Sequence, residues 1–270
     1  MEQTDGGHRA SEHRETGHRA ARAVGWPLVL VAAAIATWIT IDVLHFGPWT
    51  RLDHHASDVI APWGLHDVPF PRDVVYPLTM FGQRVSILVV IGGFVCWLSW
   101  ARRTAQPILR FIAALALLTI VIYAFKWGVG RTAPVIDTLH TNGSSYPSGH
   151  VPNSLLMWGL IAWLAVEYQV AEWLRRTLNV LRFVAPACAF LGMALLDYHW
   201  LSDLVAGVAF GIVLLRLMHL IFDTRIGRLG DSATSRGRSS AVPGGSAGPG
   251  SPDRPSPAGS PDSADRPRVS

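Results

Sequence analysis

The chain has 270 residues, of which 50% are apolar and only 16% are charged. Soluble domains are typically about a quarter charged, so this composition excludes an ordinary soluble domain and indicates a protein that faces lipid. The formal net charge of +4 is not accompanied by a basic stripe interleaved with aromatic residues. Nucleic-acid binding is therefore not expected.

Apolar residues gather in six runs, each close to the roughly 20 residues with which a helix crosses the hydrocarbon of a bilayer. These runs are 26–45, 85–100, 108–127, 151–166, 178–196 and 200–222. Buried helices of soluble bundles rarely show so many such runs with so few charges between their ends. We therefore expect an all-α fold, a polytopic membrane helix bundle of about six transmembrane helices. The first loop, 46–84, is rich in proline and tryptophan and is expected to form short interfacial helices.

Polar segments flank these runs at both ends of the chain. Residues 1–23 combine arginines and acids with a repeated Gly-His-Arg-Ala, and residues 223–270 are rich in Ser, Pro, Gly and Asp. Such compositions bury too little apolar surface to fold. We expect disordered tails at 1–23 and 223–270 around a single membrane domain at 24–222.

Arginines are distributed unevenly around the expected spans. The N-terminal tail and the segments 102–103, 175–182 and 225–228 carry arginines close to span ends, and six spans place all of them on one side. Positive residues that flank spans are enriched on the cytoplasmic side. We therefore expect a multi-pass protein of the cell membrane with both tails in the cytoplasm.

Three polar groupings then fall on the opposite, extracytoplasmic face. They read KWGVGRTAP at 126–134, YPSGH at 146–150 and HWLSD at 199–203. Ionisable groups at membrane depth are costly and mark functional sites. The active site is therefore expected on the extracytoplasmic face.

Two of these groupings have a chemistry that suits phosphate. Ser148, Gly149 and His150 begin a predicted helix, where free backbone N–H groups and the helix dipole attract an anion. His199 and Asp203 are four residues apart on a helix and share a face. The carboxylate can accept one ring N–H and leave the other nitrogen free to attack.

Each grouping alone also has a simpler explanation. Pro-Ser-Gly-His is an ordinary turn and N-cap, a His/Asp pair at this spacing is a common helix-surface contact, and Lys126 and Arg131 suit interfacial side chains. The order, spacing and common face of the three groupings favour a metal-free site for phosphoryl transfer.

At these residues the sequence resembles the type-2 phosphatidic acid phosphatase family, the lipid phosphate phosphatases related to the vanadium haloperoxidases. That family carries Lys, six residues, then Arg-Pro; Pro-Ser-Gly-His; and Ser-Arg, five residues, His, three residues, Asp. Lys126 and Pro134 match the first motif, residues 147–150 match the second in full, and His199 and Asp203 match the third.

The resemblance implies that His199 attacks phosphorus and forms a phosphohistidine, which water then hydrolyses. It implies that His150 protonates the leaving alkoxide and that Asp203 orients His199. No cofactor is expected, and no metal is expected either, because the outer loops contain no carboxylate cluster with a clear magnesium-site spacing. The residues that it implies for holding the phosphate oxygens are Lys126, Ser148 and Gly149.

Two arginines of the family pattern are absent from this chain. The first falls on Ala133, and the Ser-Arg pair of the third motif falls on Gly192 and Met193. Arg131 lies two residues before Ala133 in a glycine-containing loop. Because a guanidinium is long and suits phosphate bidentately, we hypothesise that Arg131 replaces the cation lost at Ala133 and binds phosphate.

The predicted function is hydrolysis of a lipid or polyprenyl phosphate or diphosphate in the bilayer, at the outer membrane face. A non-catalytic protein that binds or transports a lipid phosphate on the same scaffold is the alternative, because both family arginines are missing. A haloperoxidase would share the motifs, but those enzymes are soluble, whereas this chain is rich in expected membrane spans.

The expected topology can be tested by cysteine labelling of intact cells. A cysteine introduced at Asn142 is expected to react with an impermeant maleimide added from outside, whereas a cysteine introduced at Ser235 should react only after lysis. Cys96 and Cys188 fall within expected spans and would first be replaced by alanine. The reverse labelling pattern would put the tails outside and the active site in the cytoplasm.

Overall fold

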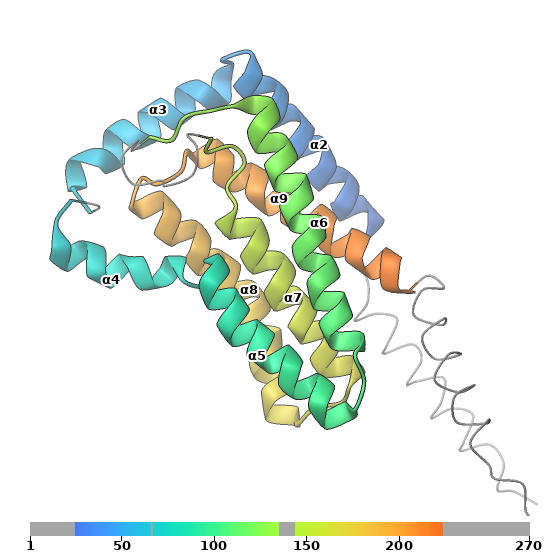
Figure 1. Ribbon diagram of the computed structural model, residues 1–270. Helices are drawn as coiled ribbons and strands as arrows, with labels where there is room; N and C mark the ends of the chain where they lie inside the picture. Colours follow the sequence, from blue (N-terminus) through green and yellow to red (C-terminus); the bar gives the residue numbers. More distant parts are fainter. Residues whose placement is uncertain (1–24, 66, 135–143, 224–270) are drawn as a thin grey trace, which may run out of the picture. The chain divides into compact units, whose positions relative to one another are not determined.

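The computed structural model describes residues 25–65, 67–134 and 144–223. Over these ranges the chain is helical and contains no β-strand, which confirms the predicted all-α fold (Figure 1). In chain order the helices are α2 (Trp26–Leu44), α3 (Pro48–Ile60), the short 3₁₀ helix η1 (Ala61–Trp63), α4 (Pro69–Thr79), α5 (Arg84–Arg102), α6 (Gln106–Val129), α7 (His150–Glu167), α8 (Glu172–Leu195) and α9 (Leu201–Asp223). The predicted tail 1–23 and all but the first residue of the tail 223–270 lie outside the described residues.

Five helices of the described chain are long and apolar enough to cross a membrane, namely α2, α5, α6, α8 and α9. The remaining predicted span corresponds to α7, which has 18 residues and begins with the sequence His-Val-Pro-Asn-Ser. Most of its side chains are buried, so α7 is surrounded by neighbouring helices more than by lipid. The 46–84 loop contains the short amphipathic helices α3 and α4, where short helices were predicted.

Proline and glycine fix several helix ends. Each of α2, α3, α4 and α6 has a proline in its first turn, where the missing N–H removes no helical hydrogen bond. Helix α6 ends at Val129 and is followed by Gly130, whose φ of +62° lies in the left-handed region that favours glycine. The chain therefore leaves α6 where the loop with Arg131 begins.

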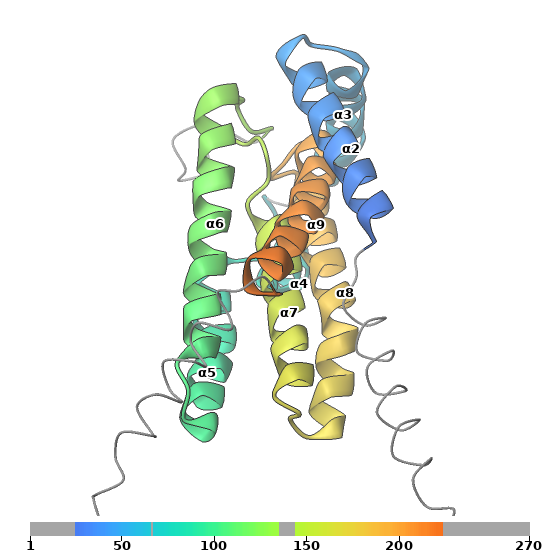
Figure 2. The same ribbon diagram turned by 90° about the vertical axis from the view of Figure 1, so that its right-hand side faces the viewer.

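Helix α7 lies in the middle of the bundle. It packs against α8 and α9, and it also contacts α5 and α6, while α2 packs against α9 (Figure 2). One apolar core joins all six long helices, and its fully buried side chains include Ile39, Ile91, Leu156 and Leu160. This core sets the positions from which the helix ends present polar residues.

The turn between α4 and α5 braces the first turns of α7. The side-chain amide of Asn153 donates a hydrogen bond to the carbonyl oxygen of Gly82 at 2.9 Å, and the indole of Trp158 donates to that of Phe81 at 3.1 Å. Gly82 lies so close to α7 that a Cβ atom would come within 2.4 Å of the backbone oxygen of His150. These contacts fix the start of α7 and, with it, His150.

A capping carboxylate joins α2 to α3. Asp42, near the end of α2, accepts a hydrogen bond from the backbone N–H of Thr50 in the first turn of α3 at 3.2 Å. A carboxylate at this place also interacts favourably with the helix dipole. Gly47 leaves room for the contact, because a Cβ atom there would lie 2.2 Å from an Asp42 oxygen. Helix α3 thereby buries the face that carries Thr50 and Asp53.

Replacing Gly82 with alanine is expected to lower the Tm of the purified protein, because the added methyl group meets the backbone of α7. Overpacking of this kind typically costs about 1–3 kcal/mol. The matched control is Gly93→Ala in α5, where a Cβ atom meets nothing within 4 Å. Thermal unfolding in detergent measures both variants, and an unchanged Tm for Gly82→Ala would contradict the bracing role.

Candidate active site

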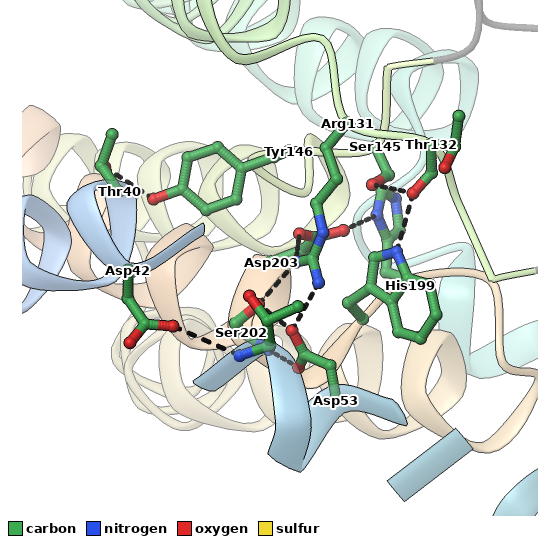
Figure 3. A network of polar contacts seen from close by, with 12 residues as sticks. Thr40, Asp42, Asp53, Arg131, Thr132, Ser145, Tyr146, His199, Ser202 and Asp203 are labelled. Atoms are coloured by element: carbon green, nitrogen blue, oxygen red, sulfur yellow. Dashed lines mark hydrogen bonds and ion pairs between the residues drawn. The ribbon is translucent and has the colours of Figure 1, made fainter. Parts of the chain in front are cut away.

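The fold brings together the three polar groupings predicted from the sequence, and Figure 3 shows members of each, namely Arg131, Tyr146, and His199 with Asp203. His150 begins α7, His199 lies in the loop before α9, and Asp203 lies in the first turn of α9. Lys126 lies in the last turn of α6, and the loop 144–149 runs into α7. The fold therefore brings together side chains from three helices and their loops.

His199 and Asp203 form the centre of this site. Nδ1 of His199 lies 3.4 Å from Oδ2 of Asp203, and both side chains are buried. Because Nδ1 faces the carboxylate, Nε2 is the ring nitrogen that remains for chemistry. The rings of His150 and His199 lie 6.3 Å apart between centroids, with their planes at 62°. One phosphate group can therefore lie within reach of both rings.

The Pro-Ser-Gly-His segment contains a buried hydroxyl without a partner. The backbone N–H of Ser148 donates to the carbonyl oxygen of Asp203 at 3.1 Å, which ties this segment to α9. Its Oγ is buried and has no hydrogen-bond partner within the described chain, an arrangement that is costly unless a ligand supplies the partner. A Cβ atom on Gly149 would meet nothing within 4 Å, so there is open space beside it. This combination fits a bound phosphate oxygen.

Lys126 holds the loop that precedes Ser148. Its Nζ donates to the carbonyl oxygens of Ser144 at 2.7 Å and of Ser145 at 3.3 Å, and Oγ of Ser144 donates back to the carbonyl oxygen of Lys126 at 2.7 Å. An ammonium group has three N–H donors, so one remains for a ligand. Lys126 therefore positions the loop while its charge stays beside the site.

Arg131 turns toward the site, but protein atoms surround its guanidinium. Nη1 donates to Oδ1 of Asp203 at 2.9 Å and to Oγ of Ser202 at 2.7 Å, and Nη2 donates to Oδ2 of Asp53 at 2.7 Å. The guanidinium lies 5.0 Å from the centre of the Trp200 ring, and the side chain is only 12% exposed. The hypothesis that Arg131 binds the substrate phosphate stays a prediction. These contacts favour a role in holding Asp203.

Asp53 of α3 is a site residue that sequence reasoning missed. It is buried and accepts hydrogen bonds from the backbone N–H of Ser202 at 2.8 Å and from the Ser202 hydroxyl at 2.5 Å. It also accepts from Arg131 and so shares that charge with Asp203 (Figure 3). The signal in the sequence is weak, since it consists only of the amphipathic pattern that buries Thr50 and Asp53 on one face of α3.

Tyr146 anchors the same loop to α2. Its hydroxyl lies 2.7 Å from Oγ1 of Thr40, and the side chain is fully buried. Burial raises the pKa of Tyr146 to about 12, so the phenol stays protonated at neutral pH. Next to it, Ser145 donates from its backbone N–H to the carbonyl oxygen of Arg131 at 2.6 Å and from its hydroxyl to that of Thr132 at 3.1 Å. The loop after α6 and the loop before α7 are thus joined.

The two positions where the family pattern has arginine hold buried apolar side chains. Ala133 and Met193 are both buried. Met193 packs in a small apolar cluster with Val151 and Leu204. Neither position therefore contributes charge to the site.

Arg84 is a further cation at this end of the bundle. It begins α5 directly after the turn that contacts His150, and its side chain is exposed. Its guanidinium lies 5.6 Å from the centre of the Tyr123 ring. In the described ranges Arg84 pairs with no carboxylate, so its charge is available to a ligand.

Comparisons with known proteins agree with these motifs. Residues 107–226 match the family model of the PAP2 superfamily. The chain is also similar to the crystal structure of a transmembrane PAP2-type phosphatidylglycerolphosphate phosphatase from Bacillus subtilis, with a TM-score of 0.63 and 18% identity, covering 73% of this chain and 96% of that chain. No curated protein matches the sequence.

These findings confirm the resemblance predicted from the three motifs, since residues 107–226 are similar to the PAP2 superfamily. The structural similarity confirms the fold of a membrane helix bundle. Together they support a multi-pass membrane protein of the lipid phosphatase type.

Proposed function

We propose that this protein is an integral membrane phosphatase that hydrolyses a lipid or polyprenyl phosphate or diphosphate through a phosphohistidine on His199. The observation that carries the proposal is the convergence of these groups. His199 has its carboxylate partner and lies 6.3 Å from the ring of a second histidine, and the segment before that histidine contains the unpartnered hydroxyl of Ser148. We place this chemistry at the extracytoplasmic face, as the arginine distribution predicts.

In the first step, Nε2 of His199 attacks the phosphorus atom and the bond from phosphorus to the lipid oxygen breaks. Asp203 keeps the imidazole oriented and stabilises the positive charge that develops on it. His150 gives a proton to the departing oxygen. The products are a phosphohistidine and the lipid alcohol, or a lipid monophosphate when the substrate is a diphosphate.

In the second step, a water molecule attacks phosphorus, the bond to His199 breaks and inorganic phosphate leaves. His150, now neutral, takes the proton from this water and is ready for the next cycle. In both steps negative charge develops on the phosphoryl oxygens. The groups that would stabilise it are the ammonium of Lys126, the hydroxyl of Ser148 and the backbone N–H of Gly149.

Two arginines have different roles in this proposal. Arg84 supplies an exposed positive charge to the phosphate, because it has no carboxylate partner in the described ranges. Arg131 positions Asp203, because its guanidinium already bonds two buried carboxylates. Asp53 accepts a hydrogen bond from Nη2 of Arg131, so only Nη1 bonds Asp203, at Oδ1. Oδ2 of Asp203 remains available to His199.

A non-catalytic binder of lipid phosphates remains the second candidate. The buried apolar side chains at Ala133 and Met193 favour it, because losing one preorganised charge contact typically costs about 2.7–4 kcal/mol of transition-state stabilisation. Turnover separates the two candidates, since both bind lipid phosphate and only the enzyme releases inorganic phosphate.

Purified protein is expected to release inorganic phosphate from at least one member of a panel of phosphatidic acid, phosphatidylglycerophosphate and polyprenyl phosphates or diphosphates. His199→Asn should abolish release, because the nucleophile is lost. The matched control is His55→Asn on the exposed face of α3. Chelator should leave the rate unchanged and vanadate should inhibit, because vanadate adopts the geometry of the transition state. Substrate binding without turnover would favour the non-catalytic candidate, and strict magnesium dependence would contradict the phosphohistidine scheme.

Arg84→Gln is expected to lower kcat/KM by roughly 100-fold, the lower end of the range for losing one stabilising donor. Arg84→Lys keeps the charge and should retain most of the activity. The matched control is Arg72→Gln in α4, where the arginine is exposed and paired with Asp73. If Arg84→Gln behaves like the control, the phosphate takes its second cation from elsewhere.

Asp53→Asn is expected to lower kcat roughly tenfold with little change in KM, by analogy with outer partners that orient metal ligands. The change removes a charge and keeps the shape, so Arg131 then draws Asp203 away from His199. A double-mutant cycle with Arg131→Gln tests whether Asp53 affects His199 through Arg131. If Asp53 acts through Arg131, the double variant should be no slower than Arg131→Gln alone.

If the losses of kcat in Asp53→Asn and Arg131→Gln are additive in the double variant, Asp53 does not act on His199 through Arg131. If Arg131→Gln instead raises KM and leaves kcat unchanged, Arg131 binds the substrate phosphate, as the sequence predicted. Thermal unfolding of each variant separates a loss of folding from a loss of activity.

A further inference from the structure

A groove of about 970 Å³ lies between α7, α8 and α9, mostly on the half of the bundle away from the catalytic histidines. Helices α8 and α9 meet at the loop 196–200 and diverge from there, while α7 packs against both of them (Figure 1). The groove is lined by Leu155, Phe190 and Val208 at its end nearer the site and by Glu167 and Gln169 at its far end. Its volume is at the upper end of the range of about 300–1,000 Å³ for ligand pockets.

Arg182 places a charge inside this mostly apolar groove. It follows Glu172, the first residue of α8, by ten positions, which corresponds to about 15 Å along a helix axis. Arg182 is the fifth residue of the apolar run 178–196, so it lies near the end of the span that is expected to face the cytoplasm. A guanidinium that lines an apolar groove at this level can bind the phosphate of a lipid headgroup.

Arg182 has no carboxylate partner in the described ranges. Arg110 bonds Glu167 at 2.5 Å, and the arginines at 175 and 176 both pair with Glu172. Arg216 also lacks an ion pair in these ranges, but it lies over the ring of Trp26 and does not line the groove. Nε of Arg182 is buried with no hydrogen-bond partner in the described ranges, and its guanidinium lies over the ring of Phe183 at 4.6 Å. The charge of Arg182 is therefore available to an anion that enters the groove from the bilayer.

We propose that this groove binds one anionic phospholipid from the leaflet opposite the catalytic histidines. Its phosphate would bond the Arg182 guanidinium bidentately, and its acyl chains would lie against Phe183, Phe190 and the apolar side of α7. Helical side chains lean toward the helix N-terminus, so the guanidinium leans toward the end of α8 at which this headgroup would enter. A zwitterionic lipid neutralises its own phosphate and is a weaker counter-ion.

This lipid is distinct from the substrate, since Arg182 is separated from the catalytic end. The apolar cluster of Val151, Met193 and Leu204 lies between the helix segments that line the groove and those that carry the catalytic residues. Bound between α8 and α9, the lipid would fix the angle at which these helices leave the loop with His199. It would therefore stabilise the folded protein and the geometry of the site.

The test compares wild type with Arg182→Gln and with Arg176→Gln, an exposed arginine on the same helix that pairs with Glu172. Native mass spectrometry and thermal unfolding are carried out in phosphatidylcholine nanodiscs with and without phosphatidylglycerol. Wild type and Arg176→Gln are expected to retain one phosphatidylglycerol and to gain several degrees in Tm. Arg182→Gln should lose both effects, and Arg182→Lys should keep part of them.

A second variant keeps the charge and blocks the space. Ala187 lines the groove from an exposed position on α8, so Ala187→Trp should fill the groove without disturbing the core, and it should also lose the retained lipid. An equal gain in Tm from added inorganic phosphate, or from phosphatidylglycerol in Arg182→Gln, would overturn the proposal. A rise in KM for long-chain substrates in Arg182→Gln, with lipid retention unchanged, would show that the groove holds substrate instead and would also overturn it.

Discussion

The carboxylate of Asp203 is shared between two partners that need it for different reasons. Oδ1 accepts from Arg131 and Oδ2 faces His199, while the main-chain oxygen of the same residue accepts from Ser148. His199, the loop 144–149 and the loop after α6 therefore take their positions from one residue at the start of α9. A small displacement of Asp203 would disturb all three, which explains why so much of the surrounding structure restrains it.

Burying two carboxylates and one guanidinium at a helix end requires that every partner be present. Buried ion pairs add little net stability, but removing one partner typically costs about 3–5 kcal/mol. Helix α3 is the element that completes the network, because Asp53 bonds Arg131 and the first turn of α9. The capping contact from Asp42 holds α3 in place. A short helix in the first loop thus has a direct influence on residues far along the chain.

The sequence predicts the membrane bundle and the convergence of three motifs, because hydrophobic runs and motif spacing are local properties. It does not predict the partner of Arg131. Asp53 stands in a polar stretch and contacts Ser202 across 149 positions, and only the amphipathic pattern of its helix distinguishes it from a solvated acid. That Arg131 binds phosphate stays a prediction, whereas the buried carboxylates that its guanidinium bonds could be found only from the tertiary structure. The burial of α7 also depends on packing, since its polar first turn weakens the hydropathy signal of a span.

Charge and packing are coupled at Met193. A phosphate monoester carries a charge of about −1.5 to −2 near neutral pH, and the proposed site faces it with Lys126 and Arg84 instead of the two family arginines. An arginine cannot be restored at Met193 by substitution alone, because the side chain packs with Val151 and Leu204 between α7, α8 and α9. A guanidinium there would have to be buried in apolar surroundings or would separate the helices. In this chain the position at which the family pattern has an arginine is used for helix packing. In the proposed site the positive charge that stabilises the phosphate therefore comes from an exposed residue, Arg84 at the start of α5.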